Sequence, residues 1–212
     1  MPDQQGYVLV VDDIPDILKL LDATLQFKGY RVVTARDGQE AIEAIQQEQP
    51  ALIIADILMP RMDGFSLLHR IRLDPETRAI PVVFLSATYV AEEDKDFARA
   101  LGVTRFIEKP VDWDKFLPII SDILSKGAPV TPTSLNEFEF YNRYRKRLEI
   151  KLKQKMTQIA RDEHVLKTLS EAEKPTFEST LQQAVKERDE IQLILGRVRE
   201  RLEKFPDPNT SE

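Results

Sequence analysis

The chain has 212 residues, 42% of them hydrophobic and 31% charged, which is enough for one ordinary domain with a buried core plus an extension. Its formal net charge is -6, and it contains no cysteine, which excludes disulfide bonds, thiolate metal sites and cysteine nucleophiles. No apolar stretch approaches the ~18 residues that a membrane-spanning helix needs, and the N-terminus lacks a signal-peptide pattern, so we expect a cytoplasmic protein with no membrane contact.

The first part of the sequence alternates short apolar runs with amphipathic segments. The apolar runs end at turn or charged residues and predict buried strands at residues 7–11, 31–35, 52–56, 82–86 and 104–108. Helices are predicted over residues 15–28, from Asp37 onward, around residues 67–71, over about 92–101 and over 113–126. Five strand–helix repeats with short connections predict an α/β fold, with helices on both faces of a doubly wound parallel sheet.

Four of the five predicted strands end on side chains that can carry chemistry. The first strand runs into Asp12 and Asp13, the third ends at Asp56, the fourth at Ser86, and the fifth runs into Lys109. In an open parallel sheet, the carboxyl ends of the strands lie along one edge, where such folds bind ligands. We therefore expect these five side chains, from four separate places in the chain, to lie close together.

Carboxylates crowded at one edge favour a magnesium site. They repel one another unless a cation lies between them, and Mg²⁺ prefers oxygen ligands. We expect the metal to bind Asp13, Asp56 and the main-chain carbonyl of Leu58, with Asp12 holding a metal-bound water.

The same edge favours transfer of a phosphoryl group to Asp56. A carboxylate can attack phosphorus to form an acyl phosphate. Lys109 would neutralise the charge that develops on the phosphoryl oxygens, and the hydroxyl of Ser86 would bind one of them. The catalytic residues predicted in this way are Asp56, Lys109 and Ser86, with Asp56 as the phosphoacceptor.

Residues 5–126 resemble a receiver domain of the response regulators of two-component signalling. The residues that carry the resemblance are Asp12-Asp13, Asp56 within Asp-Ile-Leu-Met-Pro-Arg-Met-Asp-Gly, Ser86-Ala87, Phe106 and Lys109-Pro110. Five such matches in order, at spacings that suit the predicted strands, are far more specific than any one of them.

The resemblance implies a flavodoxin-like sheet in the order 2-1-3-4-5. It also implies Mg²⁺-dependent transfer of a phosphoryl group from a phosphohistidine, on a sensor histidine kinase or phosphotransfer protein, to Asp56. Catalysis by the chain itself would be limited to its own phosphorylation and dephosphorylation. Ser86 and Phe106 would form a switch, in which the hydroxyl of Ser86 moves toward the phosphoryl group and the ring of Phe106 turns inward.

The second part of the sequence predicts an all-α antiparallel hairpin. We expect a receiver domain over residues 1–127, a linker over 128–134, a helical hairpin over 135–206 and a disordered tail over 207–212. Ser134 and Glu137 form a capping box, and no Gly or Pro interrupts a helix from Leu135 to about residue 172. Pro175 suits the first turn of a second helix.

Apolar residues in the second helix alternate spacings of four and three, interrupted only by Arg188. This seam consists of Phe177, Leu181, Ala184, Arg188, Ile191, Leu195, Val198, Leu202 and Phe205. An isolated helix pair has little core, so we expect two hairpins to form a four-helix bundle and the chain to be a homodimer. A hairpin folded onto its own receiver is the alternative. The output partner cannot be read from the sequence.

Two further features of the hairpin have alternative interpretations. The basic residues between 143 and 155 could follow a DNA groove, but the segment as a whole is nearly neutral, so DNA binding is not expected. His164 is followed by Lys167, a spacing that faintly resembles histidine phosphotransfer domains. It would make the protein a phosphorelay component in which His164 carries phosphate, although Thr168 stands where that family usually has glycine.

Overall fold

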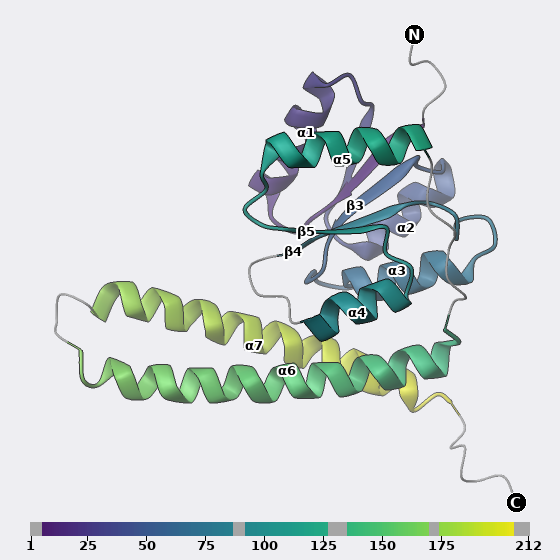
Figure 1. The fold of residues 1–212 in the computed structure, drawn as a ribbon. Helices are drawn as coiled ribbons and strands as arrows, with labels where there is room; N and C mark the ends of the chain where they lie inside the picture. Colours follow the sequence, from purple (N-terminus) through teal and green to yellow (C-terminus); the bar gives the residue numbers. More distant parts are fainter. Residues whose placement is uncertain (1–5, 87–91, 127–134, 170–173, 206–212) are drawn as a thin grey trace, which may run out of the picture. The chain divides into compact units, whose positions relative to one another are not determined.

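The computed structural model describes residues 6–86, 92–126, 135–169 and 174–205. These residues fall into two compact units that divide between Leu135 and Asn136. The first unit contains a parallel sheet of five strands in the order β2-β1-β3-β4-β5 (Figure 1). The strands are β1 (Val8–Val11), β2 (Val32–Ala35), β3 (Leu52–Asp56), β4 (Val82–Ser86) and β5 (Arg105–Glu108). The predicted doubly wound sheet and its strand order are confirmed.

Five helices connect or follow these strands. They are α1 (Pro15–Phe27), α2 (Gly38–Gln47), α3 (Gly64–Leu73), α4 (Glu92–Ala100) and α5 (Trp113–Lys126). Strands and helices begin and end within about two residues of the spans that the apolar pattern predicts, because short apolar runs bounded by Gly, Pro and Asp define these elements locally.

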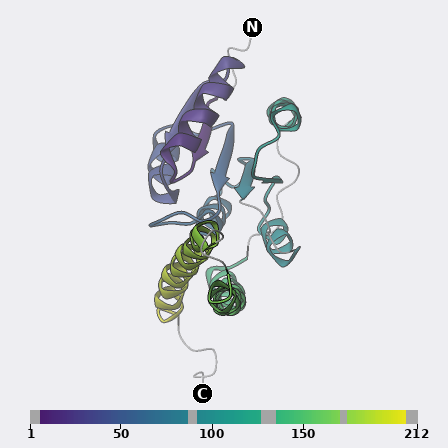
Figure 2. The same ribbon diagram turned by 90° about the vertical axis from the view of Figure 1, so that its left-hand side faces the viewer.

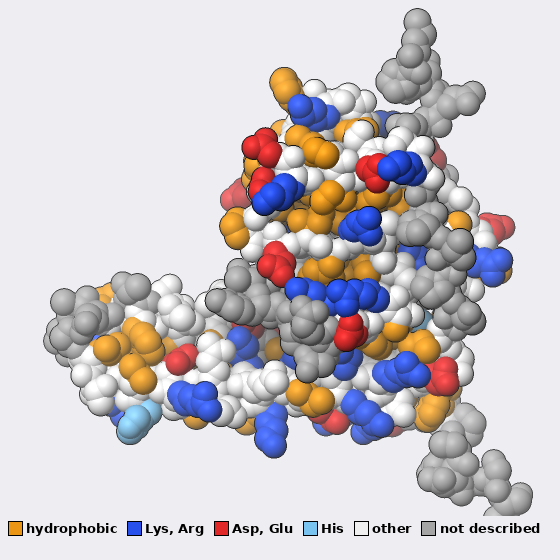
Figure 3. All heavy atoms as spheres, in the orientation of Figure 1, with side chains coloured by type: hydrophobic (Ala, Val, Ile, Leu, Met, Phe, Trp, Pro, Cys, Tyr) orange, Lys and Arg blue, Asp and Glu red, His pale blue; other side chains and the backbone are white. Residues whose placement is uncertain are grey.

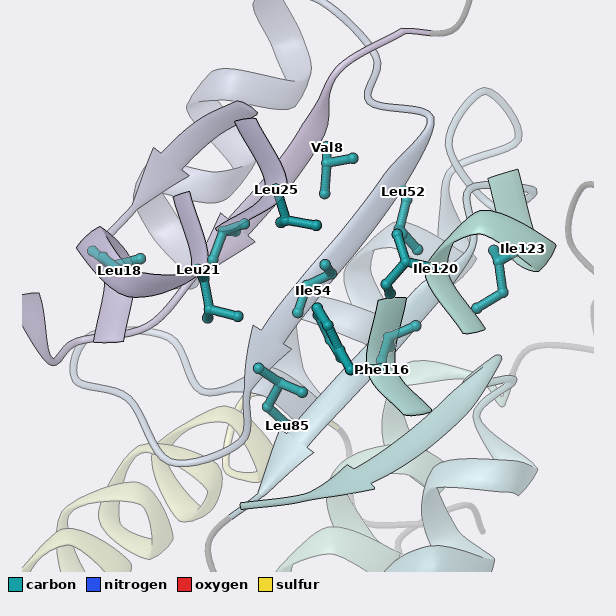
Figure 4. Packing of buried hydrophobic residues seen from close by; sticks show 12 residues of the cluster. Val8, Leu18, Leu21, Leu25, Leu52, Ile54, Leu85, Phe116, Ile120 and Ile123 are labelled. Carbon is teal, nitrogen blue, oxygen red and sulfur yellow. The ribbon is translucent and has the colours of Figure 1, made fainter. Parts of the chain in front are cut away.

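The three central strands are buried on both faces, which is why they are apolar almost throughout. Alternate residues of β1, β3 and β4 point toward α1 and α5, where Phe116 and Leu21 fill the layer between helices and sheet (Figure 4). The opposite face carries a chain of aromatic contacts. The ring centroid of Phe65 lies 5.4 Å from that of Phe84 and 5.3 Å from that of Phe97. Helices α3 and α4 thereby pack on the second face of the sheet (Figure 1).

Side-chain caps start two helices beside the carboxyl edge of the sheet. Asp37 caps α2 by accepting hydrogen bonds from the main-chain nitrogens of Gln39 and Glu40, at 2.8 and 3.1 Å. Asp63 caps α3 in the same way through the nitrogen of Ser66, at 3.0 Å. These caps anchor the loops that follow β2 and β3, and the second of those loops begins at Asp56.

The second unit consists of two long helices, α6 (Glu137–Leu166) and α7 (Lys174–Leu202). They run side by side in opposite directions (Figures 1 and 2). Cross-helix contacts give the register: the ring centroids of Phe138 and Phe205 lie 6.0 Å apart. Further along, Arg199 donates to Glu149 at 3.0 Å, and Lys155 pairs with Glu187 at 2.8 Å. The predicted antiparallel hairpin is confirmed.

The ends of α6 differ from the prediction. The cap is Asn136, whose side chain accepts from the nitrogen of Glu139 at 2.9 Å, so α6 begins after Asn136 instead of continuing from a Ser134 cap. It ends at Leu166 instead of residue 172. Near that end, the hydroxyl and main-chain nitrogen of Thr168 both bond the carbonyl of Val165, at 2.8 and 2.9 Å. A threonine that bonds back to the main chain competes with helix continuation.

The heptad seam of α7 lies on a buried side of the helix. Ala184, Ile191, Leu195 and Val198 are buried, and Ile194, which the seam did not include, is also buried. The predicted linker at 128–134 and tail at 207–212 lie outside the described residues. None of the helices in the described part of the chain is long and apolar enough to cross a membrane.

Candidate functional site

Three strand ends bring Asp12, Asp56 and Lys109 together at the carboxyl edge of the sheet. The Nζ atom of Lys109 donates to Oδ2 of Asp12 and to Oδ1 of Asp56, both at 2.7 Å. These residues are separated by 53 and 97 positions in the chain. Only the parallel pairing of β1, β3, β4 and β5 places them within contact distance.

Asp56 is a largely buried carboxylate of this site. Its side chain is 13% exposed, and its second oxygen accepts a hydrogen bond from the main-chain nitrogen of Leu58 at 2.8 Å. Burial raises the pKa of Asp56 to about 6, against the opposing effect of the positive charge on Lys109. A carboxylate with such a pKa is ionised at neutral pH and is a better nucleophile than an exposed one.

Lys109 remains charged in this environment. Burial lowers its pKa, but the charge of Asp56 and the hydrogen bonds to Asp12 and Asp56 outweigh that effect, so the pKa lies above its ordinary value. One ammonium therefore faces two carboxylates, and the carboxylate of Asp12 is only 1% exposed. The pocket keeps an excess of negative charge.

Of the remaining predicted site residues, Ser86 and Asp13 lie at the same edge, and Phe106 lies within the neighbouring strand β5. Ser86 ends β4 and is buried, one position beyond the register partner of Asp56. Phe106 of β5 lies opposite Phe84 of β4, and the two rings meet edge to face with their centroids 6.2 Å apart. Asp13 follows Asp12 and is half-buried. Ala87, which belongs to the Ser86 motif, lies outside the described residues.

The donor set suits a hard divalent cation. All candidate ligands offer oxygen, and an ionised carboxylate oxygen has a second lone pair beyond the hydrogen bond that it already accepts. Among the described residues, however, no three Asp, Glu, His or Cys side chains form a ready-made metal cluster. Instead, Lys109 bridges Asp12 and Asp56 directly. A cation bound here would share these two carboxylates with the ammonium.

One structural feature of the site was missed by sequence reasoning. Arg61, in the loop after β3, pairs with Asp37 and Glu40 at the start of α2. Asp37 was interpreted only as a helix start, and Arg61 as one member of a motif. Arg61 has a left-handed backbone conformation, with a φ of 57°. Such a conformation in a residue other than glycine leaves no signal in a single sequence, so the pair could not have been predicted.

The chemistry-bearing residues of the second unit are exposed or paired. His164 is exposed near the end of α6. In the basic stretch, Lys155 pairs with Glu187, and Arg145 lies 3.8 Å from Glu149. Figure 3 shows Lys and Arg side chains along the outer surface of the hairpin, interspersed with apolar and acidic ones. Nothing in these contacts tests the phosphorelay or DNA-binding alternatives, which stay predictions.

The site thus consists of two buried carboxylates and a bridging lysine at the carboxyl edge of a five-stranded parallel sheet. Residues 8–121 match the family model of the response regulator receiver domain. The chain belongs to this family. The match ends before α6 begins.

Individual relatives agree with this assignment. The protein PilH of Pseudomonas aeruginosa is 34% identical over 118 residues, which is 56% of this chain and 97% of that protein. The transcriptional regulatory protein GlrR of Escherichia coli is 38% identical over 132 residues, 62% of this chain, but the match spans only 29% of GlrR. The structure of the chemotaxis response regulator CheY4 of Vibrio cholerae has a TM-score of 0.53 at 32% identity. It covers 57% of this chain and 99% of CheY4.

Proposed function

We propose that the chain is a response regulator whose Asp56 accepts a phosphoryl group from a phosphohistidine on a partner kinase or phosphotransfer protein. The observation that carries the proposal is the contact of Lys109 with both Asp12 and Asp56, at 2.7 Å each, at the carboxyl edge of the sheet. This contact places a fixed positive charge beside an ionised carboxylate that is largely buried.

The proposed step is an in-line displacement at phosphorus. An oxygen of Asp56 forms a bond to phosphorus while the P–N bond of the phosphohistidine breaks. The electron pair of that bond stays on the imidazole nitrogen, which takes up a proton from solvent. Lys109 stabilises the charge on the phosphoryl oxygens, and the main-chain nitrogen of Leu58 holds the carboxylate in orientation through its 2.8 Å hydrogen bond.

Receiver domains use Mg²⁺ in this reaction. We propose Asp12, Asp13, Asp56 and the main-chain carbonyl of Leu58 as the residues that hold it. Bound there, the metal would neutralise part of the charge that gathers on the phosphoryl oxygens. The excess of negative charge around Lys109 supports such a site.

Ser86 and Phe106 are proposed as the switch that reads the phosphorylated state. Ser86 is buried at the carboxyl end of β4, which pairs with β3. Its hydroxyl therefore lies at the same edge of the sheet as Asp56, where it could bind a phosphoryl oxygen. Phe106 is half-buried, and its edge-to-face contact with Phe84 supports the packing part of the predicted switch. Phe106 has no hydroxyl, so its own part of the switch would operate by packing alone.

A direct test is phosphorylation by a small acyl phosphate in the presence of Mg²⁺. Acetyl phosphate should add one phosphoryl group, seen as a gain of about 80 Da in intact-protein mass spectrometry. The gain should be absent in Asp56→Asn, because the amide is not a nucleophile. Asp16→Asn is a matched control, since the Asp16 side chain is 92% exposed on α1, and it should gain the same mass as the wild type. A gain that persists in Asp56→Asn would overturn the proposal.

We further propose that the hairpin is a dimerisation and protein-interaction module. Within the second unit, Ile150, Met156 and Leu193 are more than half exposed, and two helices alone bury little apolar surface. Pairing of two hairpins into a four-helix bundle would cover such residues.

Light scattering at high micromolar concentration should give the molar mass of two chains, and dilution should shift the population toward one. Because charge is costly in a packed interface, we expect at least one of the single variants Ile150→Lys, Met156→Lys and Leu193→Lys to weaken the dimer. Asp162→Lys, which lies on α6 with Ile150 and Met156, serves as the control for a changed charge. A monomer at every concentration would contradict the proposed homodimer.

A further inference from the structure

The loop between β3 and α3 contains a left-handed residue that carries a side chain. Arg61 has a φ of 57°, a region where the Cβ atom crowds the main chain and which glycine adopts more readily. The loop is short, and it connects Asp56 to the first residue of α3, Gly64. A residue such as arginine persists in this conformation when its surroundings favour it.

Two acidic side chains at the start of α2 supply that stabilisation. The Nε atom of Arg61 donates to Oδ2 of Asp37, and Nη2 donates to Oε1 of Glu40 at 2.6 Å. The carboxylate of Asp37 is only 1% exposed, and its other oxygen caps α2. The other oxygen of Glu40 accepts from the main-chain nitrogen of Arg36 at 2.9 Å. Arg61 therefore binds acceptors that are themselves held in place.

Main-chain contacts tie the same loop to its surroundings at two other points. The nitrogen of Gly38 donates to the carbonyl of Met62 at 2.9 Å. Gly38 is in close contact with Met62, because a Cβ atom there would lie 2.7 Å from Cγ of Met62. At the far end of the loop, the nitrogen of Gly64 donates to the carbonyl of Ile57 at 2.8 Å. The loop is thus closed on itself and anchored to α2.

We propose that Arg61 is a positioning residue for the phosphorylation site. Its ion pairs with Asp37 and Glu40 hold the loop of residues 57–63 in the conformation that directs the nitrogen of Leu58 at Asp56 and its carbonyl at the metal. This inference rests on the proposed function of Asp56. Arg61 itself touches neither Asp56 nor Lys109 among the contacts of the described residues, so it acts through the loop.

The test compares Arg61→Met with Arg61→Lys. Lysine keeps the positive charge but cannot donate from two separate nitrogens to Asp37 and Glu40 as the guanidinium does. Arg31→Met is the matched control. Arg31 also forms a bidentate pair with a carboxylate, that of Glu48, at 2.6 and 2.8 Å, but it precedes β2, whereas Asp37 follows β2. Three quantities are measured: hydrogen exchange of the Leu58 amide in metal-free protein, the dissociation constant for Mg²⁺ by calorimetry, and the phosphorylation rate with acetyl phosphate across Mg²⁺ concentrations.

In Arg61→Met, exchange of the Leu58 amide should accelerate about 10-fold, and the Mg²⁺ dissociation constant should rise by about the same factor. The rate at limiting Mg²⁺ should fall accordingly, while the rate at saturating Mg²⁺ should stay close to that of the wild type. Arg61→Lys should recover part of the loss. Arg31→Met should change none of the three.

The inference is overturned if exchange and Mg²⁺ affinity in Arg61→Met equal those of Arg31→Met. If Arg61→Met does not fold, Glu40→Gln, which removes the negative charge opposite Arg61 and leaves one oxygen in place of two, should shift both quantities in the same direction by a smaller factor. Unchanged values overturn the inference. Failure of the proposed function would look different: wild-type protein would gain no mass with acetyl phosphate, whatever the behaviour of Arg61.

Discussion

Lys109→Ala is expected to reduce the rate of phosphorylation of Asp56 by on the order of 100–1,000-fold, the loss typical of removing one fixed electrostatic group from a reaction site. Lys109 is the cation that contacts both Asp12 and Asp56. Without it, the charge on the transferring phosphoryl group would be opposed by the metal alone. The initial rate with acetyl phosphate and saturating Mg²⁺, followed by intact mass, measures the effect.

The same substitution should change the pH dependence of the reaction. Burial raises the pKa of Asp56 to about 6, and Lys109 opposes that rise. At limiting Mg²⁺, where most Asp56 side chains have no metal beside them, the pKa of Asp56 in Lys109→Ala should be higher than in the wild type. Part of the carboxyl is then protonated at neutral pH, and the rate should still increase above about pH 7. The wild-type carboxylate is already mostly ionised there, so its rate should be nearly constant.

Lys115→Ala is the matched control, because Lys115 is 80% exposed and pairs only with the nearby Asp112 among its described salt bridges. It should leave both the rate and its pH dependence unchanged. If Lys109→Ala were phosphorylated at the wild-type rate, Lys109 would not be the residue that stabilises the charge on the phosphoryl oxygens. The main electrostatic argument for the site would then fail.

Arg72→Ala is expected to cost about 3–4 kcal/mol of the free energy of unfolding of the first unit. The guanidinium is 3% exposed and donates to the carbonyl of Ile80 at 2.9 Å and to that of Gly102 at 2.8 and 3.3 Å. It thereby joins α3 to the segments that precede β4 and β5. Truncation leaves two buried carbonyls without their donors and also opens a cavity. Burial alone lowers the pKa of Arg72 to about 10, so it stays charged at neutral pH.

Urea unfolding followed by tryptophan fluorescence measures this cost within the intact chain. Trp113 is the one tryptophan of the sequence and lies in α5, so its signal reports the first unit. Arg70→Ala, which removes an exposed arginine from the same helix, should change stability by less than about 0.5 kcal/mol. Equal midpoints for the two variants would show that the buried hydrogen bonds of Arg72 are not a major source of stability.

The sequence predicted the receiver elements well, because their signals are local. Four of the five strands are apolar runs that end at or run into Asp, Ser or Lys, and Pro15 and Asp37 mark the starts of the first two helices. The end of α6 was predicted six residues too late, since no Gly or Pro marks it and the bonds from Thr168 to the carbonyl of Val165 are visible only in the folded helix. The start of α6 was assigned to Ser134 because Ser134 and Glu137 have the spacing of a capping box. Asn caps a helix as well as Ser does, and the fold uses Asn136.

The sequence by itself determined which residues could form the site. Asp12, Asp56 and Lys109 follow apolar strands, and parallel pairing must bring such ends to one edge. Only the tertiary structure decided how they meet: one ammonium 2.7 Å from both carboxylates, with burial raising the pKa of Asp56. The tertiary structure also decided that Arg61 adopts a left-handed backbone conformation and pairs with Asp37 and Glu40. The physical reason is that the strands and helices are encoded in local apolar patterns, whereas desolvation and ion pairing depend on distances between residues far apart in the chain.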